Sequence, residues 1–422
     1  MKFHLLMNRL VKKMQPNQSP GDKVKTAYVV GTADTKGEEL KYVKEVLKMA
    51  GVNAKIIDLG PISQDSSVDV TAAKVATFHP RGADAVHKET DRGQAVTAMS
   101  AAFEAWVDAH VADIGAMIGL GGSGNTALVT PGMRKLPIGI PKVMVSTVAS
   151  GNVAPYVGPN DIAMMYSVVD IAGLNSISRK VLGNAACFIA GAMKFNLPTP
   201  PENELPNVGL TMFGVTTPCV NYISEKLKNK YECFVFHATG TGGQTMEKLT
   251  DSGRFIGLID STTTEVADLL MGGVMSAGED RLGSVARTKI PYVGSCGALD
   301  MVNFGALETV PEKYKNRKLH VHNAQVTLMR TSVEENRLMG EWIGHKLNAC
   351  EGEVRFLIPE KGVSIIDVDG MPFHDPEADK ALFDALEKTV KQTNKRKLIR
   401  LPYAINDPEF SEALCQHFLE IV

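Results

Sequence analysis

A chain of 422 residues exceeds the size of one ordinary hydrophobic core, and its 44% hydrophobic and 22% charged residues are typical of a globular protein in water, so we expect two domains. The formal net charge of −2 excludes the basic field that non-specific nucleic-acid binding requires, and no apolar run is long enough to span a membrane. The six cysteines lack CxxC spacing, which favours free thiols in a reducing compartment and hence a cytoplasmic protein that binds neither nucleic acid nor membrane.

The first domain is expected at residues 26–197, after a basic N-terminal extension at residues 1–25. Short apolar runs alternate there with segments of helical periodicity, which predicts parallel strands joined by helices that cover both faces of a sheet. The expected strands are 26–34, 53–60, 115–122, 141–150 and 161–170, and the expected helices are 36–51, 94–110, 124–136 and 174–194.

A linker is expected at residues 198–207, because the stretch NLPTPPENELPN has four prolines in twelve residues and can continue neither a helix nor a central strand. The same alternation restarts in a second domain at residues 208–422. The expected strands are 208–216, 232–240, 254–262, 291–299, 318–326, 353–362 and 397–404, and the expected helices are 219–230, 243–253, 264–273, 333–349, 376–391 and 408–420. The sequence therefore predicts an α/β protein with two Rossmann-like, doubly wound parallel-sheet domains joined by a proline-rich hinge.

Ligands of open parallel sheets bind beyond the carboxyl ends of the strands, so the residues that follow each strand are the candidates for binding. The first strand runs into GTADTKGEEL, which places Thr32, Asp34, Thr35 and Lys36 at this edge. The stretch thus places hydroxyls, a carboxylate and a cation at short spacing where ligands of this fold bind. The structural alternative is that Asp34 or Thr35 only caps the helix that follows.

The stretch AMIGLGGSGNTALV has a GxGxxG pattern between an expected strand and an expected helix. In that context, backbone N–H groups at the helix start can hold a phosphate, although a purely structural tight turn is the alternative. No lysine follows the last glycine, so this is not a Walker A loop. No acidic residue ends the next strand, so a standard dinucleotide site would lack its ribose ligand. The candidates for phosphate binding are Gly121, Gly122, Ser123, Gly124 and Asn125.

A basic loop, FHPRGADAVHKETDRG, precedes the helix expected at 94–110. Its histidines, lysine and arginines suit a polyphosphate or carboxylate ligand, or they form a solvated charged loop. Arg92, immediately before the helix, is the candidate that we retain.

The second domain repeats the first domain's pattern in FVFHATGTGGQTMEKL. His237, Thr239, Gly240 and Gly242 follow a strand there, and Asp260 ends the next strand about twenty residues later, where a ribose-binding acid would stand. Asp260 could equally cap the helix that follows it.

Further residues with catalytic chemistry lie in loops of the second domain: Glu279 in SAGEDRLGS, Cys296 in GSCGALD, His320 and His322 in LHVHNAQV, and Glu360 and Lys361 in IPEKG. Cys296 is a candidate nucleophile with His237 or His322 as its base, or else a small packed core residue. His320 and His322 have the HxH spacing of some metal sites, or else they hydrogen-bond in a binding cleft. The candidates for acid–base catalysis are His237, Asp260, Glu279 and His322.

Six motifs together resemble the ATP-binding domain family named after the tomato mosaic virus resistance protein, long known only as an uncharacterised family: GTADTKGEEL, GLGGSGNT, DIAGLNSISRKVLGNAA, FHATGTGGQTMEKL, SAGEDRLGS and HNAQVTLMRT. The resemblance runs from about Thr26 to the C-terminus and implies two Rossmann-like domains, ATP binding and a homodimer. The plant member carries this domain fused to a TIM barrel. This chain looks like a stand-alone microbial member, which a separate TIM-barrel protein could partner.

The resemblance assigns ATP to the first domain, on Thr32, Asp34, Thr35, Lys36 and residues 121–125, with Arg92 facing the phosphates and Asp34 as the carboxylate for Mg²⁺. Our first hypothesis is an ATP-binding metabolic enzyme that performs phosphoryl-transfer or ligase-type chemistry on a small anionic substrate in the interdomain cleft. The alternatives are a nucleotide-gated regulatory protein without turnover, and an ATP-independent lyase or isomerase of a sugar acid. The polar residues of the second domain favour an enzyme without establishing one.

Overall fold

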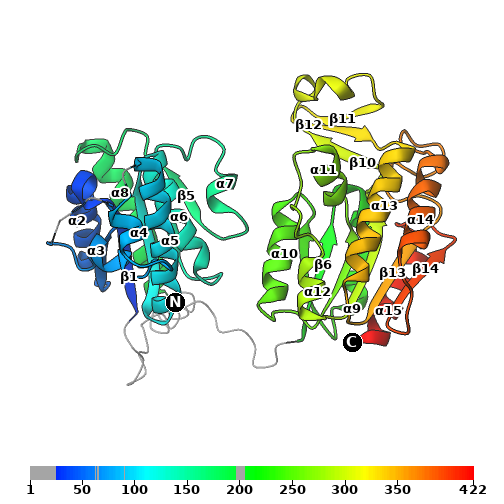
Figure 1. Ribbon diagram of the computed structural model, residues 1–422, viewed down its shortest axis with the longest axis horizontal. Coiled ribbons are helices and arrows are strands. Elements are labelled where there is room, and N and C mark those ends of the chain that lie inside the picture. The colour runs from blue at the N-terminus through cyan, green and yellow to red at the C-terminus, as the bar shows by residue number, and fades with distance from the viewer. Residues whose placement is uncertain (1–24, 62, 64–65, 90, 196–204) are drawn as a thin grey trace, which may run out of the picture. The chain divides into compact units, whose positions relative to one another are not determined.

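Figure 1 presents the computed structural model of the chain, which describes residues 25–61, 63, 66–89, 91–195 and 205–422. The chain divides into two compact units, Met1–Thr199 and Pro200–Val422, which we call unit 1 and unit 2 and treat separately. Apart from Lys25, the expected N-terminal extension lies outside the described residues, and so does the expected linker up to residue 204.

Unit 1 is a five-stranded parallel sheet with helices between its strands. The strand order is β2-β1-β3-β4-β5. The strands are β1 (Thr26–Gly31), β2 (Ala54–Asp58), β3 (Ile114–Gly121), β4 (Lys142–Ser146) and β5 (Ala163–Tyr166). The α-helices are α2 (Ala33–Met49), α3 (Ala72–Ala76), α4 (Asp84–His87), α5 (Arg92–His110), α6 (Ser123–Lys135), α7 (Ala154–Val157) and α8 (Ser176–Lys194).

The sheet of unit 1 is apolar on both faces, as expected for parallel strands covered by helices. Every residue of β1 is buried. Ala27 and Val29 belong to the core that α2 and α8 cover, whereas Tyr28 and Val30 belong to the core beneath α5 and α6. Successive side chains of one strand therefore serve opposite cores, which is why β1 appears in the sequence as a continuous apolar run.

Unit 2 contains a six-stranded parallel sheet in the order β14-β13-β9-β8-β6-β7. Its strands are β6 (Asn207–Met212), β7 (Glu232–His237), β8 (Gly257–Thr262), β9 (Tyr292–Gly297), β13 (Val354–Pro359) and β14 (Arg396–Leu401). The α-helices are α9 (Thr217–Leu227), α10 (Thr241–Asp251), α11 (Glu265–Met271), α12 (Gly283–Thr288), α13 (Val333–Asn348), α14 (Pro376–Thr389) and α15 (Pro408–Ile421).

Unit 2 also has a small antiparallel sheet, β10-β12-β11, which the sequence did not predict. It consists of β10 (Met301–Phe304), β11 (Leu319–Asn323) and β12 (Val326–Arg330), and it projects beyond one end of the parallel sheet (Figure 1). The segment expected as one strand at 318–326 is a hairpin, because β11 and β12 pair with each other around a tight turn. Periodicity indicates strands but does not indicate which sheet each strand joins.

The predicted fold class is confirmed: both units are α/β, and each has a doubly wound parallel sheet. In each unit the second strand of the parallel sheet lies on one side of the first strand, and the third strand lies on its other side. The strand order therefore reverses between β1 and β3 in unit 1 and between β6 and β8 in unit 2. At such a switch point the loops at the carboxyl ends of the strands diverge and leave a crevice in which ligands bind.

Candidate functional site

A cavity of about 690 Å³ lies at the switch point of unit 1. Its walls come from the loops that follow β1, β2 and β3, together with the start of α5 and the segment after β5. The lining residues are Thr32, Asp34, Thr35, Lys36, Gly60, Pro61, Glu89, Ala95, Val96, Gly122, Ser123, Gly124, Asn125, Leu128 and Asp170. The structure therefore brings together the residues predicted after β1 with those predicted after β3, apart from Gly121.

A hydrogen-bonded link joins the two predicted motifs. The Asn125 side chain donates to the Thr32 hydroxyl (3.1 Å) and to the carbonyl of Leu120 (3.3 Å), while the hydroxyls of Thr32 and Thr35 lie 2.7 Å apart. Gly121 makes this link possible, since its φ of +147° is strained for other residues and an added Cβ would lie 2.5 Å from Asn125 Cβ. Asn125 thus holds the starts of α2 and α6 in register.

The start of α6 is open toward the cavity. Within the described residues no side chain caps it, and the first amide bonded back to the cap residue Gly122 is that of Thr126 (2.9 Å). A Cβ added to Gly124 would meet nothing within 4 Å. The backbone N–H groups of Ser123, Gly124 and Asn125 have no acceptor within the described residues, and these three residues line the cavity at the positive end of a thirteen-residue helix, an arrangement that can bind anions.

Among the described side chains that line this cavity, carboxylates outnumber cations. Asp34, Glu89 and Asp170 line it, against Lys36, whose ammonium group donates to the carbonyl of Ile171. A polyphosphate would be repelled by this lining unless a cation accompanied it. The described residues contain no cluster of three or more side chains that could hold a metal ion by themselves. A Mg²⁺ ion at this cavity would therefore need ligand oxygens in addition to one or two of its carboxylates.

A buried carboxylate, that of Asp58, lies next to the acidic part of this cavity's lining. Asp58, at the end of β2, accepts the amides of Ala33 and Gly60 on Oδ1, at 2.9 Å each, and is fully buried. A Cβ built on Gly60 would lie 3.1 Å from Asp34 Oδ1 and 3.3 Å from Asp58 Oδ1, so both carboxylates approach this glycine closely. Asp34 is exposed and does not cap α2, whose cap residue is Thr32. Sequence reasoning missed Asp58.

The basic loop is only partly described. Of its charged side chains that the structure describes, Glu89 lines the cavity, while the Lys88 ammonium pairs with Asp84 at 2.7 Å. His79 is buried, which together with the nearby Arg81 lowers its pKa below the usual range. Arg92 begins α5, and its side chain lies outside the described part of the chain.

The glycine turn of unit 2 is already filled by the protein's own carboxylate. Glu265, fully buried at the start of α11, accepts the amides of Gly240 (2.7 Å) and Gly243 (3.0 Å), which begin α10. A Cβ on Gly242 would lie 1.8 Å from the His237 carbonyl oxygen. Glu265 thus occupies the Gly240 amide, which the sequence predicted as a phosphate donor, so this amide is not open to a nucleotide. The role predicted for Thr239 and Gly242 stays a prediction.

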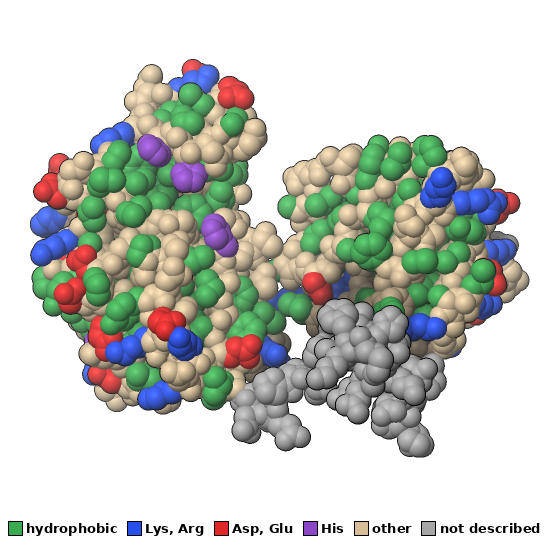
Figure 2. Space-filling view, turned by 180° about the vertical axis from the view of Figure 1, so that it is seen from behind, with side chains coloured by type: hydrophobic (Ala, Val, Ile, Leu, Met, Phe, Trp, Pro, Cys, Tyr) green, Lys and Arg blue, Asp and Glu red, His purple; other side chains and the backbone are tan. Residues whose placement is uncertain are grey.

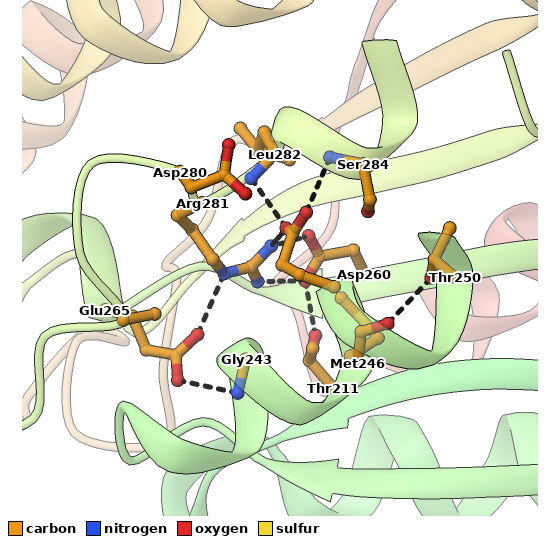
Figure 3. A network of polar contacts seen from close by, with 12 residues as sticks. Thr211, Gly243, Met246, Thr250, Asp260, Glu265, Asp280, Arg281, Leu282 and Ser284 are labelled. Atoms are coloured by element: carbon orange, nitrogen blue, oxygen red, sulfur yellow. Dashed lines mark hydrogen bonds and ion pairs between the residues drawn. The ribbon is translucent and has the colours of Figure 1, made fainter. Parts of the chain in front are cut away.

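A buried arginine explains this arrangement (Figure 3). The Arg281 guanidinium donates to Asp260 with two bonds of 2.7 and 2.8 Å and to Glu265 Oε2 at 2.8 Å, and its Nη1 lies 3.5 Å from Glu247 Oε1. Asp260 also accepts the hydroxyls of Tyr292 (2.9 Å) and Thr211 (2.6 Å). Arg281 is 1% exposed and Asp260 is 0% exposed. Asp260 is consequently neither a ribose ligand nor a helix cap but one partner of this buried network.

The remaining candidates of unit 2 do not form one site. Cys296 is fully buried and burial raises its pKa, so it is a packed core residue that a soluble substrate cannot reach. Glu279 is exposed, as are His237 and His322, and Figure 2 shows histidine side chains on one face of unit 2. The His237 ring packs against Phe213, with centroids 5.4 Å apart. A catalytic role for these three exposed residues stays a prediction.

A second buried charge cluster in unit 2 surrounds Arg330. Its guanidinium bonds to Asp367 (3.0 Å) and Asp379 (2.7 Å), and Asp300 lies close enough to interact with it. Burial raises the pKa of Asp300 to about 7, with Arg330 acting in the opposite direction, and burial also raises the pKa of Asp367 and Asp379. More carboxyl groups than cations are buried here, so the folded state retains protons that the unfolded chain would release.

This cluster predicts how stability changes with pH. Asp300 titrates near 4 when unfolded and at about 7 when folded, so the folded state binds more protons between these values and the free energy of unfolding falls as pH rises through this window. Asp300→Asn removes the group that takes up this proton. The pH dependence of the free energy of unfolding should therefore become shallower by roughly 1.4 kcal/mol per pH unit. The measurement is denaturant unfolding of the chains with and without Asp300→Asn, both carrying Trp106→Phe. Trp342 in α13 is then the remaining tryptophan, so its fluorescence reports on unit 2.

The matched control for that experiment is Asp280→Asn, which changes an exposed carboxylate whose hydrogen bonds to Arg287 lower its pKa. Between pH 4 and 7 this variant should keep the wild-type slope. If Asp300→Asn kept that slope too, the proton would have to reside elsewhere in the unit.

The fold and the cavity define a two-unit α/β protein in which the glycine turn of unit 1 opens into a cavity, whereas the glycine turn of unit 2 binds the carboxylate of Glu265. The chain belongs to the UPF0261 family, described as an uncharacterised protein family: the family's N-terminal domain matches residues 25–198 and its C-terminal domain matches residues 205–422. The predicted membership of the family that includes the tomato protein is thereby confirmed, whereas the ATP binding and the homodimer that the resemblance implied stay predictions. In the described part of the chain, no helix is long and apolar enough to cross a membrane.

Relatives from bacteria and from a plant match nearly the whole chain. A UPF0261 protein of Mesorhizobium japonicum is 56% identical over 94% of this chain and 99% of its own length, and one of Clostridium tetani is 45% identical with the same coverage. The tomato (Solanum lycopersicum) ToMV resistance protein Tm-1 is 42% identical over 93% of this chain, which corresponds to 55% of the tomato protein.

Proposed function

We propose that unit 1 binds ATP together with Mg²⁺ in its switch-point cavity, and that the protein uses this nucleotide in phosphoryl-transfer or ligase-type chemistry on a small anionic substrate. The observation that supports the proposal most strongly is the uncapped start of α6, which opens into a cavity of about 690 Å³. That volume lies within the range of known ligand sites.

The lining offers a different surface for each part of the nucleotide. Pro61, Ala95, Val96 and Leu128 supply apolar surface for a purine ring. The N–H groups around Ser123 and Gly124 supply donors for phosphate oxygens, and the hydroxyls of Thr32 and Thr35 supply further polar contacts.

The carboxylates of the lining are the reason why the proposal includes Mg²⁺. Asp34 would contribute a Mg²⁺ ligand, and Mg²⁺ would offset the excess of negative charge around the phosphates. Lys36 would exchange the Ile171 carbonyl for a phosphate oxygen, which brings a cation to the site of transfer. The γ-phosphoryl group would then pass to a substrate oxygen while ADP leaves, with catalysis by positioning and charge neutralisation.

We also propose that the chain forms a homodimer through the edge of unit 1. Strand β5 is the edge of the unit 1 sheet, and an apolar groove beside it and α8 is lined by Met165, Tyr166, Val181, Asn184, Cys187 and Phe188. The Phe188 side chain, at 64% exposed, is unusually open for its size.

The decisive experiment is calorimetric titration and thermal unfolding of the full chain with ATP and Mg²⁺, ATP with EDTA, ADP, NAD and sugar phosphates. ATP with Mg²⁺ should stabilise the protein most, by about 2.7 kcal/mol at a hundred times its Kd. Phosphorus NMR of the same samples should show ADP forming when substrate is present, and light scattering should give the mass of a dimer. If no adenine nucleotide binds, the proposal fails, and binding without any ADP would identify a regulatory protein instead.

A further inference from the structure

Unit 2 has a cavity of its own that none of the functions considered so far uses. It measures about 320 Å³ and lies where β13 and β14 end, beside the start of α14. Its lining is Glu360, Lys361, Asp369, His374, Pro376, Asp379, Lys380, Phe383 and Arg400. The carboxyl ends of parallel strands are where this fold places its ligands.

The floor of this cavity is held in place by the buried Arg330. Its guanidinium bonds to the Phe373 carbonyl (2.6 Å) and the Asp375 carbonyl (3.3 Å), which fixes the loop that carries His374. It also bonds to Asp379 Oδ1 (2.7 Å). Asp379 is only 6% exposed and lines the cavity, so a carboxyl group of restricted orientation faces whatever enters. A ligand group that donates a hydrogen bond can bond to an oxygen of this carboxyl group.

One cation at the rim has no acceptor within the described residues. Lys380 pairs with Asp384, and Arg400 pairs with Glu360 (2.7 Å) and Glu387 (3.2 Å). The ammonium group of Lys361 has no such partner in the described ranges, although its backbone N–H is fixed by the Tyr403 carbonyl (3.1 Å). Lys361 is therefore the cation that remains for an anionic group of a ligand.

His374 adds a polar group of defined orientation. Its Nδ1 lies 3.0 Å from the Asp367 carbonyl, and because a carbonyl only accepts, Nδ1 carries a proton and donates it there. Nε2 is the remaining ring nitrogen, 3.8 Å from the exposed Asp369. The cavity thus combines the Asp379 carboxyl group on its floor, which can accept hydrogen bonds, with the Lys361 ammonium group at its rim and the Nε2 nitrogen of His374.

We propose that this cavity binds a small carboxylate that also carries hydroxyl or amino groups, with the carboxylate on Lys361 and the donors toward Asp379. A simple fatty acid lacks the donors that Asp379 requires, and a polyol lacks the charge that Lys361 requires. The lining carries as many acidic as basic side chains outside His374, which suits a ligand with both kinds of group. The proposal is independent of nucleotide binding in unit 1.

The test is saturation-transfer NMR and calorimetry of the full chain with four probes: gluconate, serine, butyrate and glycerol. Gluconate or serine should bind saturably, whereas butyrate and glycerol should not. Binding of gluconate alone would identify a hydroxy acid as the ligand class, and binding of serine alone would identify an amino acid.

The matched variants are Lys361→Ala and Lys388→Ala, both exposed lysines of unit 2, of which only the first lines the cavity. Loss of the charged contact in Lys361→Ala should weaken the Kd at least about tenfold, while Lys388→Ala should leave it unchanged. Both variants should unfold at the wild-type temperature. The proposal is overturned if neither gluconate nor serine binds, if butyrate binds equally well, or if Lys361→Ala binds as tightly as the wild type.

Discussion

Replacing Arg281 by methionine should strongly destabilise unit 2. The substitution removes the only cation in contact with Asp260, Glu265 and Glu247 within the described network, and each of these carboxylates is at least nine-tenths buried. Leaving buried charge without a partner costs about 3–5 kcal/mol, against a total stability of about 5–15 kcal/mol. For a unit of this size the unfolding temperature should fall by about 6–20 °C.

Trp342 fluorescence in the Trp106→Phe background measures that change in unit 2. The matched control is Arg287→Ala in the neighbouring helix α12, where an exposed guanidinium pairs with Asp251 and Asp280. Solvent-exposed pairs contribute at most about 1 kcal/mol, so this variant should unfold near the wild-type temperature. Equal unfolding temperatures for the two variants would mean that the buried network does not hold unit 2 together.

Replacing Gly124 by aspartate should abolish ATP binding while the protein stays folded. The added side chain enters open space, and a carboxylate in the first turn of α6 is favourable for the helix. The same carboxylate would lie where the proposal puts a phosphate, and like charges at that distance cost several kcal/mol. The Kd for ATP with Mg²⁺ should rise at least about 100-fold by calorimetry.

Two controls separate charge from bulk and from helix effects. Gly124→Ala adds a methyl group without charge and should bind ATP nearly as well as the wild type. Ala127→Asp puts the same charge on an exposed residue of α6 that does not line the cavity, and should have a much smaller effect. Unchanged ATP affinity in Gly124→Asp would show that the phosphates do not lie at the start of α6.

The sequence predicted the two parallel sheets, because continuous apolar runs separated by amphipathic segments have few other solutions in a chain of this length. It also predicted that the loops after β1 and β3 meet, since the carboxyl ends of parallel strands share one edge. Whether Thr32, Asp34 and Asn125 contact a nucleotide stays a prediction.

The local pattern could not distinguish the two glycine turns. GLGGSGNT and ATGTGGQT both place glycines between a strand and a helix, and both predict open amides. What differs is Glu265, which lies 22 residues beyond Gly243 in the sequence and reaches its amide only in the folded unit. Arg281, a further 16 residues along, then neutralises part of the charge. A carboxylate that reaches the turn from so far along the chain leaves no periodic pattern in the sequence. A Glu and an Arg close to a glycine motif are the signal that could have suggested it.

The tethered carboxylate of Glu265 also has a consequence for when the loops of each unit become ordered. In unit 2 the conformational entropy of the turn before α10 is lost during folding, since Glu265 binds that turn in every folded molecule. Within the described residues no side chain caps the turn before α6, so any ordering of this turn by a ligand would be subtracted from the affinity for that ligand. Amide hydrogen exchange would accordingly be slow at Gly240 and Gly243 at all times and slow at Ser123 and Gly124 only in the complex.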